Sequence, residues 1–262
     1  MARSKAKAKA KPKAATTAGT GFAGFRPAAF AFFRGLRHNN DPDWFKPRKA
    51  VYETEVLAPF RALIAALTAA LAEAGIPLAG DPARSIFRIY RDVRFSPDKR
   101  LYKTHAGAVL TRSGEKRDPG LLYLHLEPGA SMMAAGFWHP EPPLLTRLRR
   151  AIVSDPDRFV AIAATLDAAG YPISTDEALT RLPRGFEAAK GTPVEDYVCW
   201  KSFTADAALR NRDMQSPALV DLIVDFARTL WPLLEWGWEA AEDDMPPLVI
   251  PMPARPLPRP DF

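Results

Sequence analysis

"HAGAVLTRSGEKRDPGLLYLHLEPGASMMAAGFW", residues 105–138, is the stretch of sequence that decides the fold. It contains three apolar runs, and the segments between them, SGEKRDPG and EPGA, are typical of turns. Short turns join strands that pair antiparallel, whereas parallel pairs need a long crossover. We therefore predict antiparallel neighbours among strands at 105–112, 120–127 and 130–138, with two further strand candidates at 85–95 and 197–204.

Apolar residues at helical spacing predict helices on both sides of this stretch. The predicted helices cover residues 27–36, 48–74, 142–153, 156–169 and 217–240. Asp41 followed by Pro42 predicts one more helix start, while Pro59 should kink or break the second helix and Pro232 should bend the last. Helices gathered around an antiparallel sheet indicate a single α+β domain over residues 22–240.

The two ends of the chain differ in composition from its middle. Residues 1–21 are rich in lysine and alanine and are expected to be disordered, and residues 241–262 are rich in proline. The six cations of residues 1–20 have no acid among them and account for the whole formal charge of +6. The body is therefore formally neutral, which disfavours a broad nucleic-acid-binding face on it. The basic segment either contacts polyanions weakly or only raises solubility.

Several classes of protein are disfavoured by what the sequence lacks. The one cysteine, Cys199, permits neither an internal disulfide framework nor a cysteine-rich zinc site. The chain has no apolar run of about 18 residues, so we expect a cytoplasmic protein without membrane contact. The spacings of the nucleophile elbow, the phosphate-binding loop and the zinc-protease helix do not occur. We predict no metal and no cofactor, and leave open whether the protein is an enzyme.

The segment RIYRDVRFSPDKRLYKTH, residues 88–105, carries an unusual density of charge, and we call it the charged loop. Read as a strand, 85–95 has an apolar face of Phe87, Ile89, Arg91, Val93 and Phe95, and a polar face of Ile86, Arg88, Tyr90, Asp92 and Arg94. Arg91 lies on the apolar face and therefore needs an acidic partner from another element.

The polar face of this segment has two interpretations. Two arginines on one face suit an anion such as phosphate or carboxylate, and the loop that follows could close over it. Alternatively, the arginines form an internal ion-pair network with Asp92, Asp98 and an acidic residue of a helix. The predicted ligand-binding residues are Arg88, Tyr90, Asp92, Arg94, Asp98, Lys99, Tyr102 and Lys103.

Smaller patterns elsewhere have mainly structural interpretations. His125, Glu127 and His139 have the residue types of a two-histidine, one-carboxylate iron site, but surface or core histidines are the favoured interpretation. Trp138 is expected to be buried at a helix start. Cys199 has no neighbouring histidine or helix start to activate it as a nucleophile.

The charged loop also resembles a known family. RIYRDVRFSPDKRLYKTH is similar to the hallmark of an uncharacterised conserved hypothetical family of bacteria and fungi, the domain of unknown function 2461. The similarity continues in FFRGLRHNNDPDWF, YLHLEPG, GFWHP, LPRGF and WKSF, over roughly residues 25–238. Arg100 and Leu101 depart from the pattern, which often has a small residue and a proline there. The resemblance implies a single domain and no established reaction.

The sequence leaves three hypotheses about function. The leading one is binding of, or catalysis on, an anionic or phosphate-bearing small molecule at the polar face of the charged loop. The second is association with nucleic acid through the basic N-terminal tail. The third is a structural or partner-binding domain that uses the proline-rich C-terminal tail.

Overall fold

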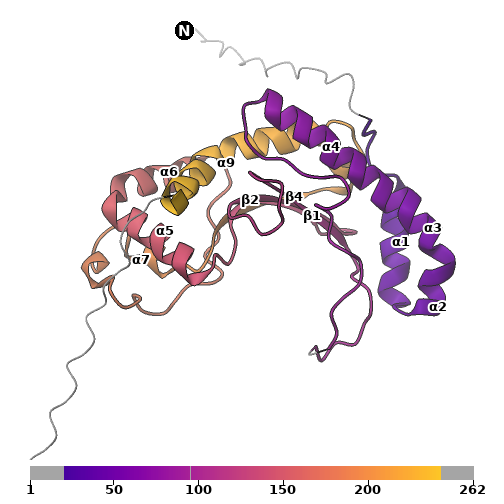
Figure 1. Cartoon of the computed structure of the whole chain (residues 1–262), viewed down its shortest axis with the longest axis horizontal. Helices are drawn as coiled ribbons and strands as arrows, with labels where there is room; N and C mark the ends of the chain where they lie inside the picture. The colour runs from indigo at the N-terminus through magenta and orange to yellow at the C-terminus, as the bar shows by residue number, and fades with distance from the viewer. Residues whose placement is uncertain (1–20, 95, 243–262) are drawn as a thin grey trace, which may run out of the picture.

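A computed structural model describes residues 21–94 and 96–242, and the structural statements below refer to these residues. The basic tail that was predicted to be disordered and the proline-rich tail lie outside them, apart from Gly21, Ala241 and Glu242. The chain forms an α+β domain built on one antiparallel sheet, as predicted (Figure 1).

The sheet has four strands in the order β1-β2-β3-β4, each antiparallel to its neighbour. They are β1 Ala106–Thr111, β2 Leu121–Leu126, β3 Ser131–Phe137 and β4 Phe203–Leu209. The first three agree with prediction, because the short connections between them favour antiparallel pairing of consecutive strands. β4 joins the edge of β3 only after a long helical connection, with Phe203 opposite Phe137.

Helices occupy both ends of the sheet and one of its faces. Before the sheet come α1 Pro27–His38, α2 Pro42–Phe45, η1 Lys46–Arg48, α3 Lys49–Val51, η2 Tyr52–Leu57 and α4 Ala58–Glu73. Between β3 and β4 come α5 Pro142–Ser154, α6 Pro156–Ala168, η3 Glu187–Ala189 and α7 Glu195–Cys199. After the sheet come α8 Asn211–Met214 and α9 Leu219–Glu242. Figure 1 shows α1–α3 at one end of the domain and α5–α7 at the other.

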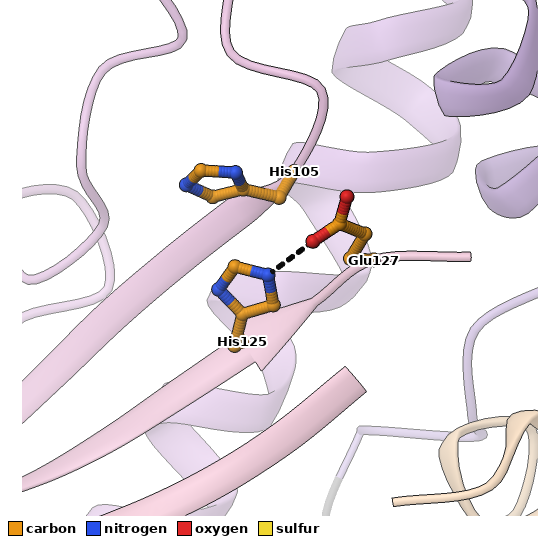
Figure 2. A group of neighbouring side chains, drawn as sticks. All are labelled: His105, His125 and Glu127. Atoms are coloured by element: carbon orange, nitrogen blue, oxygen red, sulfur yellow. Dashed lines mark hydrogen bonds and ion pairs between the residues drawn. The ribbon is translucent and has the colours of Figure 1, made fainter. Parts of the chain in front are cut away.

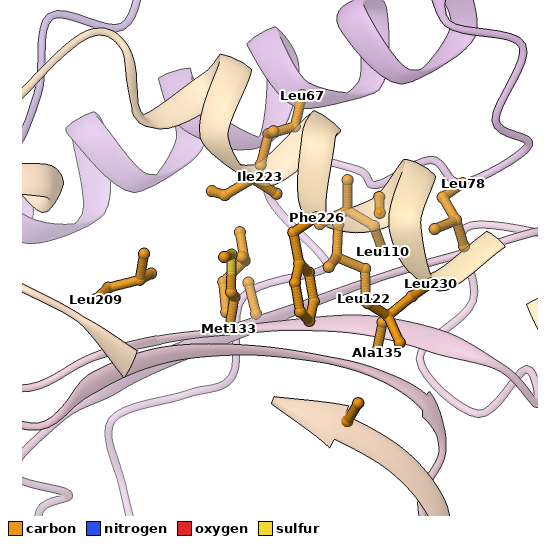
Figure 3. Packing of buried hydrophobic residues seen from close by; sticks show 14 of the residues in the cluster. Leu67, Leu78, Leu110, Leu122, Met133, Ala135, Leu209, Ile223, Phe226 and Leu230 are labelled. Atoms are coloured by element: carbon orange, nitrogen blue, oxygen red, sulfur yellow. The ribbon is translucent and has the colours of Figure 1, made fainter. Parts of the chain in front are cut away.

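The hydrophobic core lies between the sheet and α9, with α4 beside it. Along β2, Leu122, Leu124 and Leu126 are buried, while the residues that alternate with them are partly exposed. Ile223 and Phe226 of α9 lie over this buried face (Figure 3). The described helices cover the sheet from one side. On the opposite face, which we call the open face, the side chains of β2 are partly exposed, whereas β1 is buried along its whole length.

The predicted strand at 85–95 is wrong as a strand. Ile86 makes an isolated bridge to Ala108 at the edge of β1, and Tyr90 makes another to Tyr102. The segment touches the sheet only at its start. It then pairs with its own return, since the Arg91 N–H donates to the Leu101 carbonyl at 2.9 Å and the Lys103 N–H to that of Ile89 at 2.8 Å. The charged loop is therefore an extended segment that projects away from the sheet (Figure 1).

The predicted strand at 197–204 is also displaced. Residues Glu195–Cys199 form α7, and the strand begins only at Phe203. Acidic residues at the start of the segment, Glu195 and Asp196, stabilise the N-terminal end of a helix, which the apolar pattern of residues 197–204 does not reveal.

Two helical predictions involving proline can be compared with the structure. The turn before Pro59 is π-helical, from Tyr52 to Leu57, and regular α-helix resumes at Ala58. Pro59 has no N–H to donate to the carbonyl four residues back, which accounts for the predicted irregularity. In α9 the helix continues through Pro232.

The helical stretch Pro42–Glu73 is long and apolar enough to resemble a membrane span by composition. Phe60, Leu63 and Leu67 of this stretch are buried in the domain. Because core helices of soluble proteins pass the same test, this is weak evidence for a membrane span.

Candidate functional site

The charged loop is held in shape by ion pairs around Asp98. This carboxylate accepts from Arg91 at 2.5 Å and from Arg100 at 2.6 Å. Hydrogen bonds from Arg100 and then Arg91 hold the pKa of Asp98 well below its usual range. The predicted carboxylate partner of Arg91 is thus present, but it lies in the same loop rather than in another element.

Asp92 and Arg94 form a second local pair in this loop. Their side chains meet at 2.7 Å, and the Arg94 side chain is 76% exposed. The hydrogen bond with Arg94 lowers the pKa of Asp92 and raises that of Arg94. Lys99 donates to the Val93 carbonyl at 3.2 Å. Asp92, Arg94, Lys99 and Asp98 therefore make contacts within the loop. This is the arrangement expected of the internal ion-pair network.

Arg88, Tyr90 and Lys103 line a cleft of about 600 Å³ between the base of the charged loop and the helical segment from α2 to α4. We call it the basic cleft. Its described cationic residues are Lys49, Arg61, Arg88, Lys103 and Lys116. Its described lining contains one carboxylate, Glu53, which lies 3.6 Å from Lys49 in an exposed pair. The lining thus carries a clear excess of positive charge.

Two of these lysines approach the same aromatic ring, that of Phe87. The ammonium groups of Lys103 and Lys116 lie 5.3 and 5.0 Å from the ring centre of Phe87. Burial lowers the pKa of both lysines, and the charges of Arg88 and Lys116 lower that of Lys103 further. An anion bound between these groups would offset their mutual repulsion.

Aromatic side chains complete the walls. Tyr90 is 51% exposed, whereas Phe45 is buried and stacks on Tyr102 with ring centres 4.3 Å apart. Burial raises the pKa of Tyr52 to about 12, so this phenol stays neutral at physiological pH. Tyr102 is buried and does not line the cleft. Its backbone is held by Asn40, which accepts from the Tyr102 N–H at 2.8 Å and donates to its carbonyl at 2.9 Å.

Part of the lining of this cleft was not predicted from the sequence. Lys49, Arg61 and Lys116 come from α3, α4 and the β1–β2 connection, and Phe87 was assigned to the core face. No spacing or motif links these residues with Arg88, because they approach one another only through the packing of α3 and α4 beside the loop.

The histidine pattern is arranged differently from the predicted one. His139 lies past the far end of β3, because His125 is opposite Met132 in the β2–β3 register. His139 pairs instead with Glu177 at 2.8 Å. The residue that does approach His125 and Glu127 is His105, at the end of the charged loop.

Two smaller predictions have opposite outcomes. Trp138 is 66% exposed, so the prediction that it is buried is wrong; the preceding Phe137 occupies the core instead. Burial raises the pKa of Cys199, which disfavours a reactive thiolate, as the sequence analysis expected.

One glycine-rich segment has the spacing of a nucleotide-binding motif. GTGFAG, residues 19–24, has the G-x-G-x-x-G spacing of dinucleotide-binding loops. That motif requires a preceding apolar strand, and residues 1–18 contain no run of large apolar residues. Gly24 is needed for packing, because a Cβ there would lie 2.4 Å from the Gln215 carbonyl oxygen. The spacing alone therefore does not indicate a nucleotide site.

Comparison with known proteins gives one match. A family model described as conserved hypothetical protein (DUF2461) matches residues 28–236. No curated protein and no solved structure matches the chain.

Proposed function

The chain belongs to the conserved hypothetical family DUF2461, and since that description assigns no activity, we propose from the geometry that the protein binds a small anionic molecule in the basic cleft. The observation that carries this proposal is the grouping of five cationic side chains around a cleft whose described lining has one carboxylate. A molecule bearing phosphate or carboxylate groups fits the charge of the lining.

The residues have distinct roles in this proposal. Arg88 offers a planar guanidinium for two hydrogen bonds to an anion, and Lys103 and Lys116 add positive charge to the lining. Tyr90, which is half exposed, contributes aromatic surface for an apolar part of the ligand, and the buried Phe45 packs against it. Asp92, Arg94, Asp98 and Lys99 shape the loop rather than contact the ligand, and Tyr102 packs beneath it.

The size of the cleft supports a small ligand. A volume of about 600 Å³ lies within the ordinary range for small-molecule sites. The crowding of Lys103 and Lys116 against Phe87 gives a further reason, because burying two like charges is unfavourable until an anion joins them.

The test is a thermal-shift titration of the full chain with inorganic phosphate, pyrophosphate and citrate. A probe at one hundred times its dissociation constant stabilises the folded state by about 2.7 kcal/mol, which raises the melting temperature of a domain of this size by several degrees. The shift should shrink strongly in Arg88→Ala and Lys103→Ala.

Matched controls are available in the same loop. Arg94→Ala and Lys99→Ala each remove one positive charge outside the cleft lining, and they should leave the shift unchanged. Equal loss in all four variants would show that net charge alone attracts the probes. Absence of any shift with every probe would contradict the proposal for these ligand classes.

A further inference from the structure

A group of metal-ligating side chains gathers where β1 begins and β2 ends. Gly107 is opposite His125 in the β1–β2 register, so His105, just before β1, faces Glu127, just after β2. Figure 2 shows His105, His125 and Glu127 together. One ligand atom from each lies within 4.8 Å of the other two, and all three residues are partly buried.

Within this group one pair of ligand atoms is already in contact, and the two imidazole rings lie against each other. The imidazole rings of His105 and His125 stack with centres 4.3 Å apart. His125 Nε2 lies 2.9 Å from Glu127 Oε2 (Figure 2). A metal ion inserted among these atoms would replace the contact between the imidazole and the carboxylate with two metal–ligand bonds.

The second ring nitrogen of His125 and the second carboxylate oxygen of Glu127 are held by other side chains. His125 Nδ1 lies 2.8 Å from the Tyr123 hydroxyl, and Glu127 Oε1 accepts from Arg37 at 2.6 Å. Metal-binding sites are typically supported in this way, with outer partners that orient each ligand and leave one atom for the ion. Gly107 permits the arrangement, because a Cβ there would lie 2.8 Å from the Tyr123 hydroxyl oxygen.

We propose that His105, His125 and Glu127 bind a first-row divalent transition-metal ion. Two imidazole nitrogens and one carboxylate suit zinc, cobalt or ferrous iron better than calcium or magnesium, which prefer oxygen ligands. This goes beyond the proposed anion-binding function, which needs no metal and rests on a different set of residues.

One of the three proposed ligands lines a cleft. His105 and Tyr123 border a second cleft, of about 730 Å³, on the open face of the sheet, whereas His125 and Glu127 are not among its lining residues. Three protein ligands leave further coordination positions for water or a small molecule, as in catalytic rather than purely structural sites.

The experiment is a titration of the full chain, without a histidine tag, with Co²⁺ followed by visible absorption and then displacement by Zn²⁺. We expect one equivalent of Co²⁺ to produce a ligand-field band that Zn²⁺ abolishes. His105→Ala, His125→Ala and Glu127→Gln should each weaken affinity by more than tenfold. Tyr123→Phe, which removes an outer partner, should weaken it by about 10- to 100-fold.

The two remaining histidines provide matched controls. His38→Ala and His139→Asn remove imidazoles outside the group and should leave the titration unchanged; asparagine suits the positive φ of 43° at position 139. Circular dichroism reports whether each variant folds. If the histidine variants do not fold, Glu127→Gln still tests the proposal, because glutamine has nearly the same shape as glutamate. Absence of stoichiometric binding, or binding unaffected by Glu127→Gln and lost in the controls, would overturn the proposal.

Discussion

At the scale of single residues, the charged loop contains side chains of two kinds. Asp92, Arg94 and Asp98 form ion pairs with neighbours in the loop, whereas Arg88 and Lys103 line the basic cleft. Charged residues a few positions apart therefore have different surroundings.

Asp98→Asn should lower the melting temperature at neutral pH, because Arg91 and Arg100 then lose their shared carboxylate. The pKa of Asp98 is depressed in the folded state, so its contribution is fully present above the pKa of the unfolded chain, near 3.8. The contribution is lost as the pH falls through the lower folded-state pKa. Thermal melts from pH 7 downward should therefore show the two proteins converging in acid, and a difference that persists there would contradict this account.

At the scale of elements, the β3–β4 pair depends on one glycine. Gly136 has a φ of 130°, and a Cβ at this position would lie 2.1 Å from the Phe203 carbonyl oxygen. Neither the backbone conformation nor the space permits a side chain. The close approach allows β4 to join the sheet after its long connection.

Gly136→Ala should therefore destabilise the domain strongly, whereas Gly129→Ala is the matched control. Gly129 also has a positive φ, 79°, but a Cβ there would meet nothing within 4 Å. The control should cost only the conformational penalty, about 1–2 kcal/mol. Denaturant unfolding of both variants measures the difference, and equal losses would show that the contact with Phe203 is unimportant.

At the scale of the whole molecule, the charge is unevenly divided. The formal charge of +6 is carried by residues 1–20, and the rest of the chain is formally neutral. The basic cleft is thus a local excess of positive charge on a neutral body. We therefore expect any non-specific attraction to polyanions to come from residues 1–20, separately from the anion binding that we propose for the basic cleft.

Deletion of residues 1–20 should abolish retention on heparin at low salt, because this segment carries six cations and no acid, and cations that contact a polyanion release its counterions. The thermal shift with small anions should persist in the same deletion variant, since the basic cleft is intact. Retention that survives the deletion would place a polyanion-binding surface on the body. Loss of the small-anion shift would place that binding in the basic segment.

The sequence by itself determined the local features of this protein: the helices, the three-strand meander, the uneven charge and the resemblance carried by the charged loop. These follow from periodicity and turn residues, which act over a few positions. Only the tertiary structure decided that 85–95 leaves the sheet, that Lys49, Arg61 and Lys116 meet Arg88, and that His105 rather than His139 approaches His125. Such contacts depend on strand register and helix packing, which place residues far apart in sequence side by side and leave no periodic signal in the sequence.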